Sequence, residues 1–583
     1  SVKLSTESFI IRQIENLSDL QKPAKILENA YQGKTAIILA GGPSLNSILP
    51  WVKEHRKELV VLSISRISKQ ILDANITPDF IFSVDPQEIN FGVSHDMLLF
   101  NEQPIFIHAN HIFPGLLNQW HGTSLYLGQR LCWKSPLNIN NLSSEGPTVT
   151  NSALLTAYHF GFDTILLAGV DLCYSEHGIT HANGSAEQIA GPKYNTTSLQ
   201  VETYNNEYRT TEEAYFFALQ NLSQRAKHIV ENNKIVINLS KDAAKADGII
   251  HIPPEKIELP PLNKSAREIA NEKLNIYNKK NDDLAYYNDA INELTKAKHQ
   301  ISSIEKIAKK ANKINAAMYD ERGIINNYKD KKNLDKSEKT LSKKHTIFSQ
   351  LIKNFGIRQF LKISSPHEDK RAWEAEQAKE MGKIYYDAYE NGAHKLSSLI
   401  DSAISRIKSR QEENQERPNF QLLFNQWNKD HSYKRAALWK NAHPQTLIPN
   451  DDEKEFELFS KNFSEYVHNA NITQKSTLGA GRADIDSLKI KAKILFSHKQ
   501  LKELNVLRNN FLEDRKTHDL VWAAVPGILL LVWIGIAKLH YDAIVNLWSF
   551  IPPMVVLAIF ILSFVLILAE YLHRTIAAWF GSI

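Results

Sequence analysis

An apolar run near the start of the chain, Thr35–Leu39, ends abruptly at the Gly-Gly-Pro-Ser-Leu loop Gly41–Leu45. A short apolar run followed by a glycine-rich loop and a helix is typical of a buried strand in a parallel α/β sheet. Glycine lets the backbone approach a ligand closely, and the N–H groups at a helix start bind anions, most often phosphate. The loop predicts a nucleotide or phosphate site; the alternative is a strand-to-helix turn that needs small residues for packing.

The same alternation of apolar runs and helical patterns continues along the first half of the chain. Apolar runs at 59–64, 80–84, 105–107, 125–127, 164–168 and 235–239 predict strands, and 68–74, 148–160 and 211–229 have helical periodicity. This order predicts a Rossmann-like domain over residues 34–261, with a parallel sheet covered on both faces. Ligands of such sheets bind at the carboxyl ends of the strands, where Gly41, Asp85 and Asp171 fall.

The segments on either side of this domain have different sequence patterns. Residues 1–33 form an N-terminal segment without a clear signal, whereas residues 262–515 predict a helical domain, with Leu294, Ile301 and Ile304 at helical spacing. A helical bundle or a coiled-coil arm fits this pattern. The lysine-rich run Lys329–Lys344 shows no apolar face, and we expect a loop or a frayed linker there.

Residues 516–583 predict a membrane anchor of two helices. The apolar runs Leu520–Leu539 and Ile551–Ala569 each have the length, roughly 20 residues, that spans a bilayer core. Basic residues such as Lys516 and Arg574 lie outside the hairpin, so the positive-inside rule places both ends in the cytoplasm. We expect an inner-membrane protein whose catalytic domain faces the cytoplasm; the alternative is a buried hydrophobic hairpin that serves oligomerisation.

Composition narrows the class further. A net charge of +5 over 583 residues argues against a dedicated nucleic-acid binder. The two cysteines, Cys132 and Cys173, are too few for a disulfide framework and predict reduced thiols. No cluster of Cys and His has the spacing of a zinc site.

Four short motifs, in order along the chain, resemble the DUF115 family, also called the motility-associated factor (Maf) glycosyltransferases. They are Gly41–Leu45 after a strand, Ile76–Asp85, Gly169–Leu172 continuing to Gly178–Ala182, and Tyr208–Thr211 at the opening of a helix. The resemblance covers roughly residues 34–260, less than half of the chain. It implies a nucleotide-sugar-binding fold similar to that of family-42 bacterial sialyltransferases.

The resemblance also implies an activity. Proteins of this family are implicated in moving nonulosonic acids from CMP to Ser and Thr of flagellin, and the related sialyltransferases use CMP-sialic acid without a metal. A CMP-sugar donor, no metal and no other cofactor are therefore expected. Two departures matter: Asn205–Arg209 lacks the His that those enzymes use as general base, and Gly146–Asn151 lacks their donor-binding Arg.

His181 is our first candidate for the missing base, because an imidazole titrates near neutral pH and this one lies in a motif-bearing loop. His177 is the alternative base, and Asp171 is a second catalytic candidate that positions substrate. The donor-binding candidates are Gly41, Gly42, Pro43, Ser44, Asp85, Thr148, Thr150, Asn151 and Arg209. For these the plainer alternatives are a capping role for the helix-start residues, a turn role for the aspartates and a solvated Arg209.

Two other classes of function remain open. A distant relative of the domain is an archaeal pterin diphosphokinase, so Mg²⁺-dependent diphosphate transfer from ATP is one alternative, with Asp85, Asp171 and Glu202 as carboxylate ligands. A non-catalytic, membrane-tethered scaffold is the other. For a transferase the acceptor is flagellin, or a glycolipid such as lipopolysaccharide at the inner leaflet, which an anchor suits better. An oligomer is compatible with the sequence.

Overall fold

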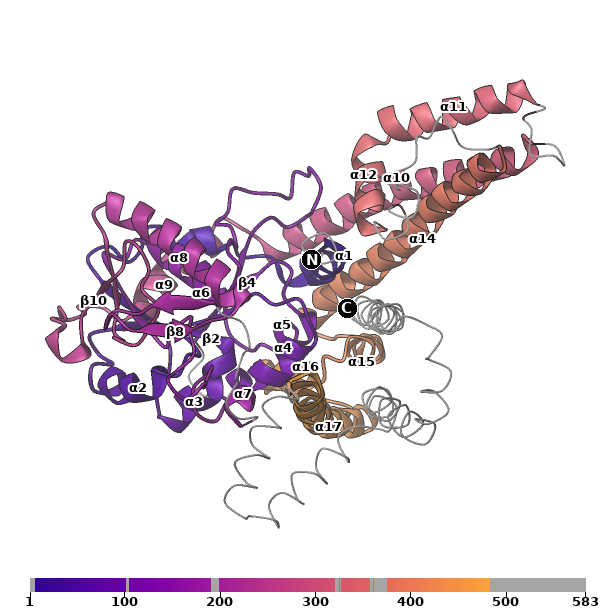
Figure 1. The fold of residues 1–583 in the computed structure, drawn as a ribbon. Coiled ribbons are helices and arrows are strands. Elements are labelled where there is room, and N and C mark those ends of the chain that lie inside the picture. Colours follow the sequence, from indigo (N-terminus) through magenta and orange to yellow (C-terminus); the bar gives the residue numbers. More distant parts are fainter. Residues whose placement is uncertain are drawn as a thin grey trace, which may run out of the picture. The chain divides into compact units, whose positions relative to one another are not determined.

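The computed structural model describes residues 6–100, 104–189, 199–319, 325, 327–356, 360 and 375–482. These residues belong to one compact unit. Within it, an α/β domain carries a long helical arm (Figure 1). The Rossmann-like domain and the helical region predicted from the sequence are both confirmed.

The main sheet is built from the apolar runs. Its strands are β1 (Thr35–Leu39), β2 (Val60–Ile64), β3 (Phe80–Ser83), β4 (Ile105–Ala109), β5 (Ser124–Leu127), β6 (Thr164–Ala168), β9 (Ile235–Asn238) and β10 (Ile250–His251). The central strand β1 is buried at every position because helices cover both of its faces. A separate antiparallel pair, β7 (Gln200–Glu202) and β8 (Tyr208–Thr210), lies between β6 and β9 in the chain.

All strands of the main sheet are parallel, in the order β10-β9-β6-β1-β2-β3-β4-β5. From β1 the chain adds strands on one side as far as β5, and it then returns to place β6 on the other side of β1. The register aligns Leu39 with Ala168, so these two strands end together. A reversal of this kind is where α/β proteins form their ligand crevice.

Helices cover the sheet. They are α2 (Leu45–Glu54), α3 (Ser68–Asp73), α4 (Ile89–Ser94), α5 (Pro114–Leu117), α6 (Val149–Phe160), α7 (Ala186–Ile189) and α8 (Glu213–Glu231). Helix α6 packs on β1, β2 and β3, and α8 packs on α6 and β9. Gly161 ends α6 in a left-handed conformation (φ +95°), which is the C-cap that the sequence predicts.

The N-terminal segment is an integral part of the core. Helix α1 (Thr6–Glu15) and two short 3₁₀ turns, Asn16–Asp19 and Ala24–Leu27, bury Ile14, Leu17 and Leu20 completely. Helix α1 packs against two helices of the arm, α12 (Thr346–Phe355) and α14 (Ala375–Glu413). The segment therefore joins the α/β domain to the arm.

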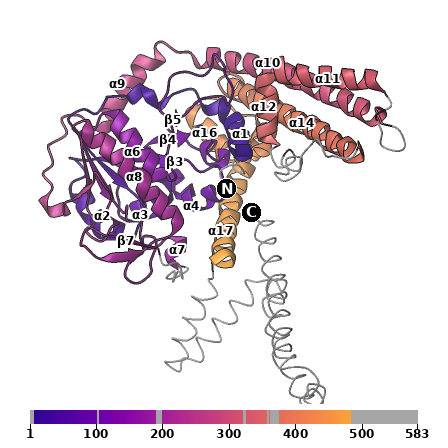
Figure 2. The same ribbon diagram turned by 45° about the horizontal axis from the view of Figure 1, so that its top comes forward.

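The arm is an antiparallel coiled coil of α10 (Asp283–Ala317) and α14, entered through α9 (Ala266–Asn278) (Figures 1 and 2). Buried residues recur at intervals of four and three in α10 (290, 294, 297, 301, 304, 308, 311) and in α14 (389, 393, 396, 400, 403, 407). This is the heptad spacing of a coiled-coil seam. Cross-pairs such as Lys298–Asp401 (2.6 Å) fix the antiparallel register.

The lysine-rich run expected to be a loop is instead a helix, α11 (Tyr328–Lys343), so that prediction was wrong. It packs back along α10. Leu341 is buried and Leu334 is half-buried, and the two leucines lie seven residues apart on one side of the helix. They supply the apolar contact of α11, but two residues are too few to form a full apolar face in the sequence.

The last described helices return from the arm to the α/β domain. They are α15 (Phe420–Lys429), α16 (Lys434–Ala442) and α17 (Asn450–Arg482). Figure 2 shows α17 beside α4, and Phe463, Tyr466 and Val467 pack against the main core of the α/β domain. The aromatic ring of Tyr466 lies 4.6 Å from that of Phe91.

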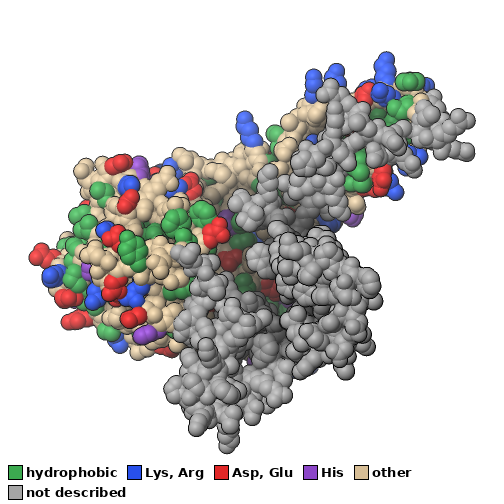
Figure 3. All heavy atoms as spheres, viewed as in Figure 1, with side chains coloured by type: hydrophobic (Ala, Val, Ile, Leu, Met, Phe, Trp, Pro, Cys, Tyr) green, Lys and Arg blue, Asp and Glu red, His purple; other side chains and the backbone are tan. Residues whose placement is uncertain are grey.

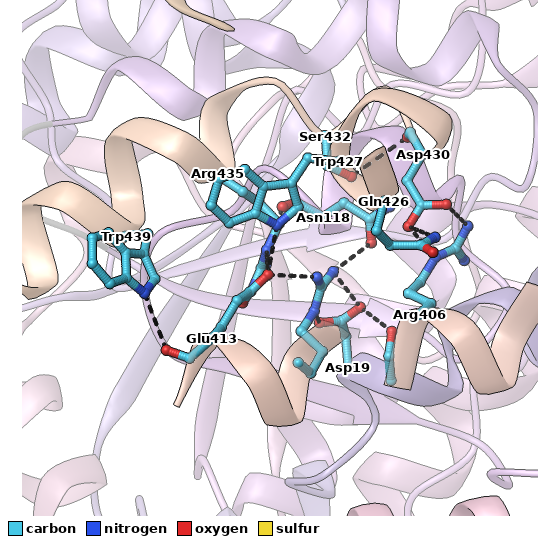
Figure 4. A network of polar contacts seen from close by, with 12 residues as sticks. Asp19, Asn118, Arg406, Glu413, Gln426, Trp427, Asp430, Ser432, Arg435 and Trp439 are labelled. Carbon is cyan, nitrogen blue, oxygen red and sulfur yellow. Dashed lines mark hydrogen bonds and ion pairs between the residues drawn. The ribbon is translucent and has the colours of Figure 1, made fainter. Parts of the chain in front are cut away.

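A buried polar network fastens these helices to the N-terminal segment (Figure 4). Arg410 of α14 pairs with Asp19 at 3.0 Å and with Glu413 at 3.1 Å, and Glu413 also pairs with Arg435 of α16. Arg406 contacts both oxygens of Asp430 at 2.8 Å. Buried charges are tolerated only when they are paired in this way.

The predicted membrane hairpin at 516–583 lies outside the described residues, and so does the end of the helical domain predicted to reach residue 515. None of the helices in the described part of the chain combines the length and the apolar character that a membrane crossing requires.

Candidate active site

The carboxyl ends of β1 and β6 bring two loops together at the reversal point of the sheet. The β1 loop carries Gly41, Gly42, Pro43 and Ser44 and leads into α2, and the β6 loop carries Gly169 and Asp171. Since neighbouring parallel strands end at the same edge, the two glycine-containing loops lie side by side there. The sequence places its first and third motifs at this position.

Ser44 and Asp171 join the two loops directly. The Ser44 N–H donates to Oδ2 of Asp171 at 2.8 Å, and the Ser44 hydroxyl donates to Oδ1 at 2.6 Å. Burial, reinforced by nearby Asp242, raises the pKa of Asp171, whereas hydrogen bonds from Ser44 and Ser240 oppose the rise. Asp171 thus occupies the anion position at the start of α2, and the Ser44 hydroxyl that we assigned to a phosphate is engaged by this carboxylate.

The glycines are required by the closeness of the loops. The Gly42 N–H donates to the Gly169 carbonyl at 2.7 Å, and a Cβ on Gly42 would lie 2.4 Å from Oδ2 of Asp171. Gly169 has φ +68°, and a Cβ there would lie 2.2 Å from the Ala40 carbonyl oxygen. At Gly41, by contrast, the nearest atom to a Cβ is 3.4 Å away, and the next belongs to the His181 ring at 3.8 Å. Of these three glycines, Gly41 is therefore the one at which a side chain would meet the loosest contacts.

His181 is held over this glycine loop. The next residue, Ala182, donates its N–H to the Gly41 carbonyl at 2.8 Å. The imidazole Nδ1 lies 2.9 Å from the Thr180 hydroxyl, and the ring centroid is 6.5 Å from that of Tyr215. The alternative base, His177, is exposed at the tip of a turn. The structure thus brings together Gly41, Asp171 and His181, and it leaves His177 at the surface.

Asp85 lies at the end of β3, two strands away from β1. Its carboxylate accepts the Gln87 N–H at 2.9 Å, as a turn aspartate does. Burial raises its pKa, while the Gln87 hydrogen bond and the charge of Arg66 oppose the rise. Asp85 is half-buried.

Arg66 is a functional candidate that the motif search missed. It follows β2, between the strands that carry Gly41 and Asp85, and it forms an ion pair with Glu187 of α7. Glu187 lies just beyond the His181 loop, so this ion pair links the middle of the sheet edge to that loop. The signal in the sequence is a single arginine directly after a buried strand.

The helix-start residues hold α6 in place. Thr148 is the N-cap: its Oγ1 accepts the Asn151 N–H at 3.4 Å and donates to Asn151 Oδ1 at 2.5 Å. Asn151 Nδ2 donates to the Ala218 carbonyl and to Asn221, each at 3.1 Å, which ties α6 to α8. Thr150 is buried. All the contacts recorded for Thr148 and Asn151 thus serve capping and helix packing.

Arg209 lies in strand β8, whereas the sequence placed it at the opening of a helix. It is surrounded by carboxylates: Glu207 at 2.5 Å, Asp242 at 3.9 Å and Glu176 at 4.0 Å. Its side chain is only 15% exposed, which rules out a solvated position. Three acidic neighbours leave this guanidinium with little net charge to offer a ligand.

The carboxylates that a magnesium-dependent reaction would need are dispersed. Asp171 is engaged by Ser44, Asp85 by Gln87, and Glu202 of β7 pairs with Lys245 at 3.4 Å. In the regions that the structure describes, no three His, Cys, Asp or Glu side chains are grouped to hold a metal ion. The described residues do not fit the ligand set that we weighed for the diphosphokinase alternative.

The comparisons with known proteins bear on the same part of the chain. Residues 11–177 match a family model described as "6-hydroxymethylpterin diphosphokinase MptE-like". This is a model of the DUF115 type, so the resemblance inferred from the motifs is confirmed for the segment that includes Gly41, Asp85 and Asp171. The match ends before His181.

Solved structures also match, among them a MAf glycosyltransferase from Magnetospirillum magneticum AMB-1. The two are 15% identical with a TM-score of 0.44, and the match covers 69% of this chain and 61% of that protein. No protein with a curated function matches the chain significantly.

Proposed function

We infer that the α/β domain is a glycosyltransferase that moves a CMP-activated acidic sugar, of the nonulosonic or sialic acid type, to a hydroxyl acceptor. The observation that carries this inference is the hydrogen bond from Ala182 to Gly41, because it fixes His181 above the glycine loop at the reversal point of the sheet. This contact supports the proposal that His181 acts as a base beside the strand ends where α/β proteins bind nucleotides, as transfer to a hydroxyl requires.

In this reaction the acceptor oxygen attacks the anomeric carbon of the sugar while the bond from that carbon to the phosphate oxygen breaks. His181 takes the acceptor proton, and CMP leaves with the bonding electrons on its phosphate. Because Asp171 already accepts from the Ser44 N–H at the start of α2, we assign the developing phosphate charge to the N–H of Gly41. Asp85, at the neighbouring edge, accepts from the ribose hydroxyls.

We assign the sugar carboxylate to Arg66 in place of Arg209. Arg209 is already neutralised by Glu207, Asp242 and Glu176. A guanidinium recognises carboxylates in a planar, two-point geometry. Arg66 also lies between Gly41 and Asp85, where a nucleotide sugar would extend along the strand ends.

The same proposal covers the acceptor of the sugar and the cellular location of the protein. We propose flagellin Ser or Thr, or a glycolipid of the inner leaflet, as the acceptor, with residues 516–583 as an inner-membrane anchor. The apolar runs at 520–539 and 551–569 support the anchor, and the anchor favours the glycolipid.

Diphosphate transfer from ATP to a pterin is the second candidate, favoured by the family model that residues 11–177 match. The two reactions release different nucleotides. Full-length protein is incubated with CMP-nonulosonic acid, with a UDP-sugar, or with ATP and hydroxymethylpterin, each with and without Mg²⁺, and the released nucleotide is measured. CMP release without Mg²⁺ supports the transferase. AMP release that needs Mg²⁺ supports the diphosphokinase, and no release from any donor supports the scaffold.

A further inference from the structure

The outward face of α11 is a continuous stripe of lysines. Going along the helix, the stripe residues are Lys329, Lys332, Lys336, Lys339 and Lys343, and all five are exposed. Spacings of three and four residues place side chains above one another on one face of a helix. At 1.5 Å per residue the stripe is about 20 Å long. Figure 3 shows Lys and Arg side chains projecting from the edge of the arm where α11 lies.

The stripe faces directly away from the contact between α11 and the rest of the arm. Leu334 and Leu341, which make that contact, lie on the opposite side of the helix. Two acidic residues of α11 are off the stripe: Asp330 is held by the Asn327 cap, and Glu338 accepts a hydrogen bond from Tyr386 of α14 at 2.7 Å. The third, Asp335, is exposed at the edge of the stripe, three residues after Lys332 and four before Lys339. Among the described residues of the arm, the lysines that form ion pairs are Lys298 and Lys309 of α10, and none of the stripe lysines does.

An ordinary solvent-facing helix mixes both signs of charge, since opposite charges three or four residues apart stabilise a helix and like charges destabilise it. Here each stripe lysine has another lysine as its neighbour at that spacing, and Asp335 is the one acidic residue at that spacing from any of them. The arrangement costs helix stability in isolation, and an extended surface of negative charge would offset that cost.

The exposed Tyr328 indicates which kind of negatively charged surface the lysine stripe contacts. It begins α11, directly before the first stripe lysine, and is 74% exposed. An exposed tyrosine beside a row of lysines suits the boundary of a lipid bilayer, where the ring enters the headgroup layer and the ammonium groups meet lipid phosphates. The chain also contains two apolar runs of bilayer-spanning length, at 520–539 and 551–569.

We propose that the lysine stripe of α11, with Tyr328, docks on a membrane surface rich in anionic phospholipid. The contact is separate from any insertion of the C-terminal apolar runs, because it uses charge and a helix of the arm. It also stands independently of the reaction that the α/β domain catalyses.

Oxidative footprinting of Tyr328 tests this contact in the full-length protein. The protein is reconstituted into vesicles of phosphatidylcholine alone or of phosphatidylcholine with phosphatidylglycerol, and exposed to hydroxyl radicals at low and at high salt. We expect Tyr328 oxidation to fall several-fold only with phosphatidylglycerol at low salt. Equal oxidation in both kinds of vesicle at low salt would overturn the proposal.

Two variants distinguish the effect of the stripe lysines from the effect of positive surface charge in general. The first replaces the five stripe lysines by Gln, which keeps the helix and its length. The matched control replaces five exposed lysines of the α/β domain and its neighbour α9 by Gln: Lys53, Lys57, Lys256, Lys273 and Lys279. The proposal requires that the lipid-dependent protection of Tyr328 disappear in the first variant and persist in the second. Loss in both variants, or protection by soluble polyphosphate as strong as that by vesicles, would contradict a lipid surface.

Discussion

Ser44 donates both its backbone N–H and its hydroxyl to the carboxylate of Asp171, at 2.8 and 2.6 Å. This pair closes the gap between the β1 and β6 loops at the reversal point of the sheet. A carboxylate from one loop thereby occupies the start of the helix that follows the other. The glycine loop is shaped first by this contact.

The first prediction concerns Asp171. Asp171→Asn should unfold at nearly the wild-type urea concentration, because burial already raises the pKa of this carboxyl and the amide oxygen can still accept from Ser44. Asp171→Ala leaves the Ser44 N–H without its partner and should cost about 1–3 kcal/mol of unfolding free energy. Equal stability of the two variants would show that the Ser44 contact contributes little.

A second prediction follows from the space around the two glycines. Gly42→Ala should lower the unfolding free energy by about 1–3 kcal/mol, since its Cβ would lie 2.4 Å from Asp171 Oδ2 and 2.6 Å from the Gly169 carbonyl oxygen. Gly41→Ala is the matched control, because its Cβ would meet no atom closer than 3.4 Å. Urea titrations of both variants measure the difference, and a larger loss for Gly41→Ala would refute this account of the loop.

Much of this site was accessible from the sequence. The apolar runs that end in glycine or aspartate predicted the strands, and parallel pairing then places Gly41, Asp85 and Asp171 at one edge. What the sequence cannot reveal is which polar groups satisfy one another. The donors assigned to a phosphate at Ser44 and Asn151 find protein partners that are distant in the chain, whereas Thr148 caps the helix that follows it.

The helical region also shows which contacts cannot be predicted from the sequence. The long helices followed from their periodicity, but α11 was taken for a loop because one buried leucine and one half-buried leucine are too few to form a visible pattern. The docking of α17 on the α/β core was not foreseen either. Contacts such as Tyr466 with Phe91 join residues far apart in the sequence, and local periodicity carries no information about them.

The buried network predicts a specific loss of stability in acid. Burial opposes ionisation of Asp19, but the charges of Arg410 and Arg435 outweigh it and lower its pKa from 3.8 to about 2. A folded-state pKa below the unfolded one stabilises the fold above pH 4, and this contribution, about 2 kcal/mol, is lost as the pH falls from 4 to 2. Glu413 and Asp430 are shifted in the same direction.

Urea unfolding measured between pH 6 and pH 2 checks this dependence. Asp19→Asn should be less stable at pH 6 and should show a shallower decline below pH 4. If the unfolding free energies of the variant and of the wild type decline in parallel as the pH falls, Asp19 does not make the predicted contribution to stability.

The two histidines of the β6 loop give a prediction about catalysis. His181→Ala should bind CMP as the wild type does but lose about 10²–10⁴-fold in turnover, which is the usual contribution of a general base. His177→Ala should leave turnover unchanged, since His177 is exposed at the tip of its turn. Turnover that survives in His181→Ala and falls in His177→Ala would exchange their roles.

The central claim is that the crevice beside Gly41 binds a CMP-linked donor without a metal, and calorimetric titration of full-length protein with CMP in the presence of a chelator tests it most directly. Two variants accompany the wild type. Gly41→Leu projects a side chain toward Ile67 and His181, where we propose that the donor binds, whereas Ser47→Leu adds the same side chain at an exposed position of α2. The account predicts CMP binding by the wild type and by Ser47→Leu, and its loss in Gly41→Leu. A wild-type protein that does not bind CMP, or that binds only ATP and only with Mg²⁺, would contradict the proposed donor.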